Sequence, residues 1–363
     1  MPANMPDNYE LPYPAYCARF PRSSKHLVTA IVGAQYASEA EHDGLATAHL
    51  SAFMKAGVTS QPSFWELASE TDSNGAYNIA IIAYWPSKAS YTDWTVTSGF
   101  QKWWEDLDPN REPIGWFLEV FFPSIDRFET CLSDKEVLEG AAHMGETMSG
   151  PIAEHSYWGS VRDRLPICQT DAVIGEKSHI QTRQQRCAVS TGRRIRISGK
   201  RNLAVIRSGQ DWSRMYPDER KLYLETIHPV LVNGMNFLRD HGDEVGCYSC
   251  RFMQIIDPVS HKVDKKRTFG LAYFDDLGSL ERWSKQHPTH LNIFDAFLKY
   301  TKHLNNNISL RLFHEVLVLE PEQQLFEYVG CHEDSGMLVS KRRNKFSHFK
   351  CCFIPQIFRW ICR

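Results

Sequence analysis

The chain has 363 residues, of which 42% are hydrophobic and 23% are charged, so it can bury a large core, and its composition argues against collagen-like, fibrous and disordered classes. A formal net charge of −2 lacks the strongly basic balance typical of nucleic-acid-binding domains, so we expect no nucleic-acid partner. The first 25 residues contain five prolines and no continuous apolar run. We therefore expect no signal peptide, no membrane span and a cytoplasmic location.

Residues 79–85 form an apolar, strand-like run, which leads through Pro86 and Ser87 into an amphipathic, helix-like stretch ending near Trp94. The same pattern returns late in the chain, where residues 272–274 read Ala-Tyr-Phe like the Ala-Tyr-Trp of residues 83–85, and Trp283 follows at the spacing of Trp94. This repetition predicts a strand followed by a helix in two places.

The match continues through a second pair of segments. Glu119-Val120 and later Phe128-Glu129 correspond to Glu315-Val316 and later Phe326-Glu327. The repeat predicts an α+β fold of two ferredoxin-like halves, with antiparallel sheets packed into a barrel-like core and helices outside. We expect one pseudo-duplicated domain over residues 1–338, with halves near 25–135 and 245–335 and a connecting region at 140–245.

Two histidines break the repeat. His290 corresponds to Gln101 in the first copy, and His314 corresponds to Leu118. Any chemistry is therefore expected in the second half.

Apolar residues at 291, 293, 294 and 297 surround His290 on a predicted helix, and a neutral imidazole on an apolar wall is what a haem ligand requires. His314 shares a predicted strand face with Leu310, Leu312 and Val316. Either histidine could instead have a purely structural role, because a histidine on an apolar face is more often a hydrogen-bonded core residue.

Arg162, Arg164 and Ser208 stand beside aromatic or strand segments, but alone they read as surface arginines and a turn serine. No G-x-S-x-G elbow surrounds Ser208, and no phosphate-binding loop, dinucleotide fingerprint or H-E-x-x-H motif occurs. Among ten cysteines, Cys247 and Cys250 form one C-x-x-C pair, which is a weak zinc or redox signal by itself.

Several long blocks resemble the haem-containing aldoxime dehydratases, also called phenylacetaldoxime dehydratases. The resemblance covers about residues 8–338, and the blocks follow one another in the order of the family pattern. The blocks are Tyr157-Trp158-Gly159-Ser160 with Arg162 and Arg164, Gln169-Thr170-Asp171, residues 206–212, Gly234-Met235, residues 237–240, residues 246–249, residues 280–284 and residues 287–291.

The resemblance implies a lyase that converts small-molecule aldoximes to nitriles with haem b, ferrous in the active state. It makes His290 the proximal iron ligand and His314 the distal acid and base, with Ser208 holding the oxime hydroxyl. It makes Arg164 the distal arginine, with Arg162 as a less favoured occupant, and Glu129 an acidic residue of the surrounding shell. It also implies that the oxime nitrogen binds the iron opposite His290, without net redox change.

The alternatives are a haem-dependent or cofactor-free monooxygenase and a non-enzymatic haem carrier or gas sensor on the same fold. The family further implies a homodimer. The preferred aldoxime, aliphatic or arylaliphatic, does not follow from the sequence. Residues 339–363 form a basic, cysteine-containing tail that we expect to be disordered, although a gene-model artefact or a membrane-surface contact would give the same composition.

Overall fold

A computed structural model describes residues 3–177, 192–257 and 262–341 of the chain. Within these residues an 11-stranded antiparallel sheet runs in the order β6-β12-β9-β11-β10-β3-β4-β2-β5-β13-β8, beside a two-stranded β1-β7 pair. The strands are β1 (Ala18–Arg19), β2 (Val28–Tyr36), β3 (Phe64–Thr71), β4 (Tyr77–Trp85), β5 (Gly115–Phe121), β6 (Phe128–Leu132), β7 (Thr147–Met148), β8 (Arg194–Ile197), β9 (Leu203–Asp211), β10 (Cys247–Ile256), β11 (Val263–Phe274), β12 (Arg311–Leu319) and β13 (Gln324–Val329).

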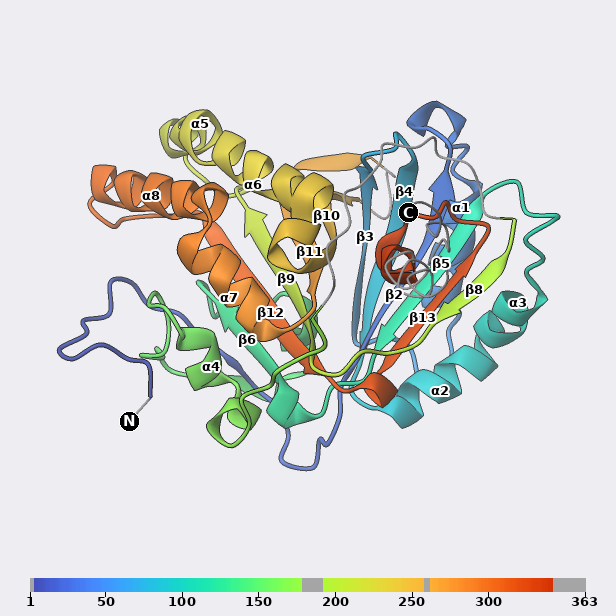
Figure 1. The fold of residues 1–363 in the computed structure, drawn as a ribbon, viewed down its shortest axis with the longest axis horizontal. Helices are drawn as coiled ribbons and strands as arrows, with labels where there is room; N and C mark the ends of the chain where they lie inside the picture. Colours follow the sequence, from blue (N-terminus) through green and yellow to red (C-terminus); the bar gives the residue numbers. More distant parts are fainter. Residues whose placement is uncertain (1–2, 178–191, 258–261, 342–363) are drawn as a thin grey trace, which may run out of the picture.

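The α-helices lie outside the curled sheet, which forms a half-barrel (Figure 1). Helices α1 to α3 cover one flank, and α5 to α8 cover the other (Figure 1). The helices are α1 (Leu45–Met54), α2 (Lys88–Thr97), α3 (Phe100–Asp106), α4 (Ser160–Arg164), α5 (Pro217–Thr226), α6 (His228–His241), α7 (Leu277–Gln286) and α8 (Pro288–His303).

Each flank repeats the element order β-α-β-β-α-β that is typical of ferredoxin-like units. The first copy runs β2, α1, β3, β4, α2 with α3, and β5, and the second runs β9, α5 with α6, β10, β11, α7 with α8, and β12. In both copies the sheet order is fourth, first, third and second strand. The predicted mixed fold, with antiparallel strands inside and helices outside, is confirmed, and β3 pairs with β10 so that the two sheets are continuous.

The strand that follows each copy pairs with the last strand of the other copy. The strand that follows the first copy, β6, pairs with β12 of the second, whereas β13 pairs with β5 of the first. The second copy also begins earlier than the sequence repeat indicates, because β9, α5 and α6 all lie within residues 140–245, the segment that we expected only to connect the halves. That segment escapes a sequence search because its similarity to the first copy is in topology and not in residues.

Burial on both sheet faces explains why the central strands read as nearly continuous apolar runs. Every residue of β2 and β4 is buried. On β2, Ile31 packs into the core between the two flanks, and Val32 packs against the helices of the first flank. Such strands have lost the apolar and polar alternation of a half-exposed strand.

The C-terminal boundary also differs slightly from the prediction. Val339 and Ser340 are buried, so the packed part of the chain continues past residue 338. The remainder of the predicted tail, residues 342–363, lies outside the described residues. Among the helices that are described, none is both long and apolar enough to cross a membrane.

Candidate active site

Ser208 and His314 lie side by side on neighbouring strands. Their Cα atoms are direct partners in the antiparallel β9–β12 pair. Ile206 and Val316, two residues away on the same strands, pack beneath the helices of the second flank. Because side chains on a strand alternate between faces, Ser208 and His314 share this helix-covered face. The sequence predicted a turn for an isolated Ser208, but the residue is in mid-strand.

Glu129 and Arg164 form a buried ion pair next to His314. Glu129 lies on β6, the other neighbour of β12, and Arg164 is the last residue of α4, which starts after Gly159 in a left-handed conformation. Arg164 Nε lies 2.7 Å from Glu129 Oε2, and both side chains are less than 5% exposed. A further Arg164 nitrogen, Nη1, donates to the backbone carbonyl of Glu154 at 2.5 Å. The guanidinium is therefore fixed on two sides.

The imidazole of His314 meets both members of this pair. Its Nε2 lies 2.8 Å from Arg164 Nη2 and 3.3 Å from Glu129 Oε1. Arginine can only donate, so Nε2 accepts from Arg164 when the imidazole is neutral, whereas a protonated Nε2 has the Glu129 carboxylate as its partner. Each protonation state of His314 thus has a partner, which suits a group that gives and takes a proton.

The charges of the pair are held firmly. Burial of the Glu129 carboxyl group would raise its pKa, but Arg164 and His314 together outweigh burial and lower the pKa to about 2. Burial opposes the charged form of Arg164, yet the Glu129 carboxylate raises the pKa of its guanidinium above the usual value. Both groups are therefore ionised at neutral pH.

Arg162 points elsewhere. Its Nε donates to Glu281 on α7 at 2.8 Å, and its Nη1 donates to the backbone carbonyl of Ala172. Of the two arginines that the sequence offered, Arg164 reaches His314.

His290 is a neutral imidazole in apolar surroundings on α8. Its ring centroid lies 4.8 Å from that of Trp283 and 6.3 Å from that of Trp158. Burial lowers the pKa of His290 to about 4, an effect that the backbone of Ser284 offsets only in part. The Nδ1 atom is buried and makes no regular hydrogen bond within the described residues. A neutral imidazole among aromatic side chains has the protonation state and the apolar surroundings that a haem iron ligand requires.

His290 makes no hydrogen bond or ring contact with Ser208, His314, Arg164 or Glu129 in the part of the chain that is described. Tyr13 lies between α8 and the group around His314. Its ring lies 5.9 Å from that of Phe297 on α8 and 5.3 Å from that of His155, which is near Arg164 and His314. The structure thus brings Ser208, His314, Arg164 and Glu129 together and places the fifth predicted residue, His290, on α8.

Sequence reasoning missed His155. It is 4% exposed, its Nε2 has no hydrogen-bond partner among the described residues, and the charges of Arg164 and His314 act on it. Burial, the largest influence, lowers its pKa. Its position two residues before the Tyr157-Trp158 block was the available signal.

Among its described residues, the first flank has no comparable site. Leu118 on β5 and Gln101 on α3 occupy the positions of His314 and His290. Aromatic side chains fill the space between this sheet and its helices, with Trp94 stacked on Phe100 at 4.9 Å and Trp103 against Trp116 at 5.0 Å.

Cys247 and Cys250 are buried, reduced thiols on β10. Burial raises the pKa of Cys250 well above its usual value, which favours the unreactive thiol form. The described residues contain no group of three or more side chains arranged to hold a metal ion.

Comparison with known proteins finds a matching family and several relatives. A family model described as haem-containing dehydratase matches residues 30–337. The chain is 36% identical over 334 residues to the aliphatic aldoxime dehydratase of Pseudomonas chlororaphis, covering 92% of this chain and 93% of that protein. It is 31% identical over 338 residues to the phenylacetaldoxime dehydratase of Bacillus sp. strain OxB-1, covering 92% and 93%.

A crystal structure of an aldoxime dehydratase in complex with butyraldoxime superposes with a TM-score of 0.82 at 34% identity, covering 93% of this chain and 91% of that one. The extent of these matches shows that the chain belongs to the family of haem-containing dehydratases.

Proposed function

We propose that this protein binds haem through His290 and dehydrates aldoximes to nitriles, with His314 as the acid and base. The observation that carries the proposal is the His314 imidazole held between Arg164 and Glu129 and beside Ser208, in a chain of this family. We further propose a homodimer in the cytoplasm, by analogy with the family, which sedimentation and cell fractionation test.

The reaction requires two bonds to break. An aldoxime, R-CH=N-OH, loses the hydrogen on carbon and the hydroxyl on nitrogen, and the products are R-C≡N and water. Hydroxide is a poor leaving group, so a proton must reach the oxygen, and a base must then accept the proton from carbon. Haem, when bound, supplies an iron centre that binds and polarises the oxime nitrogen.

The side chains divide these tasks. Ser208, the strand neighbour of His314, holds the oxime hydroxyl by a hydrogen bond. His314 donates a proton to that oxygen as water departs, and the neutral imidazole then takes the proton from carbon. Glu129 faces the protonated state and Arg164 the neutral state, so neither stage leaves Nε2 without a partner. One imidazole can therefore serve both steps in sequence.

The apolar face beside His290 suits a hydrophobic macrocycle. Leu291 and Phe294 on α8 are 37% and 36% exposed and give the helix an apolar surface beside the half-buried His290. The ring of Phe294 lies 5.4 Å from that of Trp158, so both line the same side of the helix.

The test is an anaerobic absorption spectrum of the haem-reconstituted, dithionite-reduced protein before and after addition of phenylacetaldoxime or butyraldoxime, with nitrile measured in the same cuvette. A shifted Soret band with nitrile supports the proposal, and the faster substrate identifies the aldoxime class. A Soret band without nitrile would leave a haem protein of another function, such as a monooxygenase or a sensor. Absence of a Soret band would refute the assignment of His290.

A further inference from the structure

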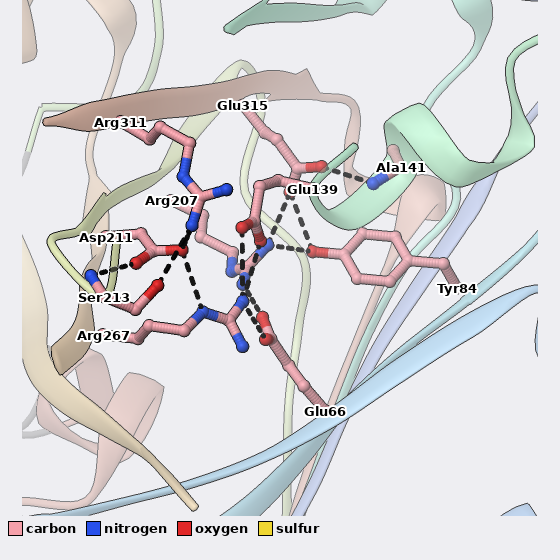
Figure 2. Close-up of polar contacts among 10 residues, drawn as sticks. All are labelled: Glu66, Tyr84, Glu139, Ala141, Arg207, Asp211, Ser213, Arg267, Arg311 and Glu315. Atoms are coloured by element: carbon pink, nitrogen blue, oxygen red, sulfur yellow. Dashed lines mark hydrogen bonds and ion pairs between the residues drawn. The ribbon is translucent and has the colours of Figure 1, made fainter. Parts of the chain in front are cut away.

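A buried cluster of charged side chains lies directly behind the candidate active site. Arg207 precedes Ser208 on β9, and Glu315 follows His314 on β12. Neighbouring side chains on a strand point to opposite faces, so Arg207 and Glu315 point into the space between the two flanks (Figure 2). Their Cα atoms are partners in the β9–β12 register, one step from the Ser208 and His314 pair.

Arg207 contacts side chains of both flanks. Its guanidinium forms a close ion pair with Glu66 on β3 and donates a hydrogen bond from Nη1 to the Tyr84 hydroxyl on β4 at 3.1 Å (Figure 2). Both Glu66 and Tyr84 belong to the first copy. The guanidinium also lies between two rings of the second copy, 4.5 Å from the centroid of Phe269 and 4.8 Å from that of Phe313. Since Phe313 immediately precedes His314, the arginine fixes β12 beside the candidate catalytic histidine.

Glu315 is held as firmly on the other side of His314. Its carboxylate accepts a hydrogen bond from the Tyr84 hydroxyl at 2.8 Å and one from the backbone N–H of Ala141 at 2.6 Å (Figure 2). Arg207 Nη1 lies 3.7 Å away. Gly140, with a positive φ of 50°, permits this close approach, because a Cβ there would meet Glu315 Oε1 at 2.3 Å. The backbone at Gly140 and Ala141 therefore packs directly against the Glu315 carboxylate.

An outer layer continues the network (Figure 2). Arg267 on β11 bridges Glu66 at 3.3 Å and Glu139 at 3.1 Å, and Arg311 on β12 bonds closely to Asp211 on β9. The cluster contains four carboxyl groups and three guanidinium groups. The carboxyl groups belong to Glu66, Glu139, Asp211 and Glu315, and the guanidinium groups belong to Arg207, Arg267 and Arg311. The inner members Glu66, Arg207 and Glu315 are at most 7% exposed, and such charges tolerate little displacement because each depends on its partner for solvation.

The internal repeat supplies a counterpart without a catalytic neighbour. Tyr273 on β11 donates to Glu119 on β5, as Tyr84 donates to Glu315. Arg251 Nη1 lies 2.7 Å from Glu119 Oε2, so this tyrosine also completes a buried arginine–glutamate cluster. The residue before Glu119 is Leu118, where the residue before Glu315 is His314. The same arrangement of tyrosine, glutamate and arginine therefore lies behind a candidate active site in one copy and behind an apolar core in the other.

We propose that Arg207 and Glu315, clamped by Glu66 and Tyr84 of the first copy, are positioning residues that fix Ser208 and His314 relative to each other for dehydration. The proposal rests on the proposed function of Ser208 and His314, and it gives the flank that lacks a site of its own a role in the reaction. The physical reason is the steep dependence of proton transfer on geometry, since a displacement of about 1 Å can lower a rate by roughly 10²-fold.

Tyr84→Phe and Tyr273→Phe form a matched pair of variants for the test. Each removes one buried hydroxyl that donates to a glutamate of the other copy, and both tyrosines are at most 1% exposed. We expect comparable losses of thermal stability. Per bound haem, we expect kcat of Tyr84→Phe to fall by about tenfold with little change in KM, and kcat of Tyr273→Phe to stay within about twofold of wild type.

A double-mutant cycle separates positioning from general destabilisation. If Tyr84 acts through the placement of Ser208, then Tyr84→Phe should lower kcat much less in a Ser208→Ala background than in the wild type. The Soret shift on adding phenylacetaldoxime should persist in Tyr84→Phe. Should Tyr84→Phe fail to fold, Glu315→Gln is tested with the same readouts, because it keeps an acceptor for Ala141 and balances carboxyl and guanidinium groups within the cluster.

The outcomes are distinct. Loss of kcat in Tyr84→Phe alone, together with non-additivity, supports positioning. Equal kcat losses in both tyrosine variants, or additivity with Ser208→Ala, would overturn it. A wild-type protein that forms no nitrile would refute the proposed function instead, before any variant is compared.

Discussion

Replacing Glu129 by glutamine should remove a large, pH-dependent contribution to stability. The folded-state pKa of Glu129 is lowered from the ordinary 4.5 to about 2, which corresponds to about 3 kcal/mol. Because the folded pKa is depressed, this stabilisation is fully present above about pH 4.5 and is lost as the pH falls toward 2. In Glu129→Gln, the guanidinium of Arg164, 4% exposed, would lose its carboxylate partner.

Urea unfolding of the wild type and Glu129→Gln, followed at several pH values, measures this effect. Between about pH 5 and about pH 3 the wild type should lose roughly 2 kcal/mol more stability than the variant. Glu136→Gln is the control, because the side chain of Glu136 is 79% exposed and its removal should change little. A stability difference between wild type and Glu129→Gln that stays constant across this pH range would refute the buried-pair interpretation.

Three further variants test the site. His290→Ala should lose haem, seen as loss of the Soret band after reconstitution, whereas His303→Ala at the end of the same helix should retain it; full haem content in His290→Ala would refute the ligand assignment. His314→Ala should keep haem but lose roughly 10²–10⁴-fold in kcat, and near-normal nitrile formation would exclude it as acid and base. Ser208→Ala should still shift the Soret band with aldoxime yet turn over about tenfold more slowly, since one hydrogen bond to the hydroxyl is lost; an unchanged kcat would remove Ser208 from the mechanism.

The internal repeat shows how far local sequence patterns reach. The repeated segments fall on corresponding elements, β4 with β11 and β5 with β12, because apolar periodicity and spacing are local properties of the chain. The same repeat singled out His290 and His314 as departures, and resemblance to known blocks identified the family. The second copy's first strand, β9, and its helices α5 and α6 were missed, since no residue pattern links them to the first copy.

Contacts between distant segments were decided by the tertiary structure. The sequence did not choose firmly between Arg162 and Arg164, because both lie in one short helix and only their directions separate them. Arg164 meets Glu129 from 35 residues away and His314 from 150 residues away, through the pairing of β6 with β12.

The same holds for the pairing of β6 and β13 with the other copy and for the charged cluster behind Ser208 and His314. Apolar periodicity indicated the repeated strands and their buried faces, and the residue blocks carried the resemblance to the family. Only the folded chain decided which charges are buried together, because long-range strand register sets the distance between groups that lie far apart in sequence.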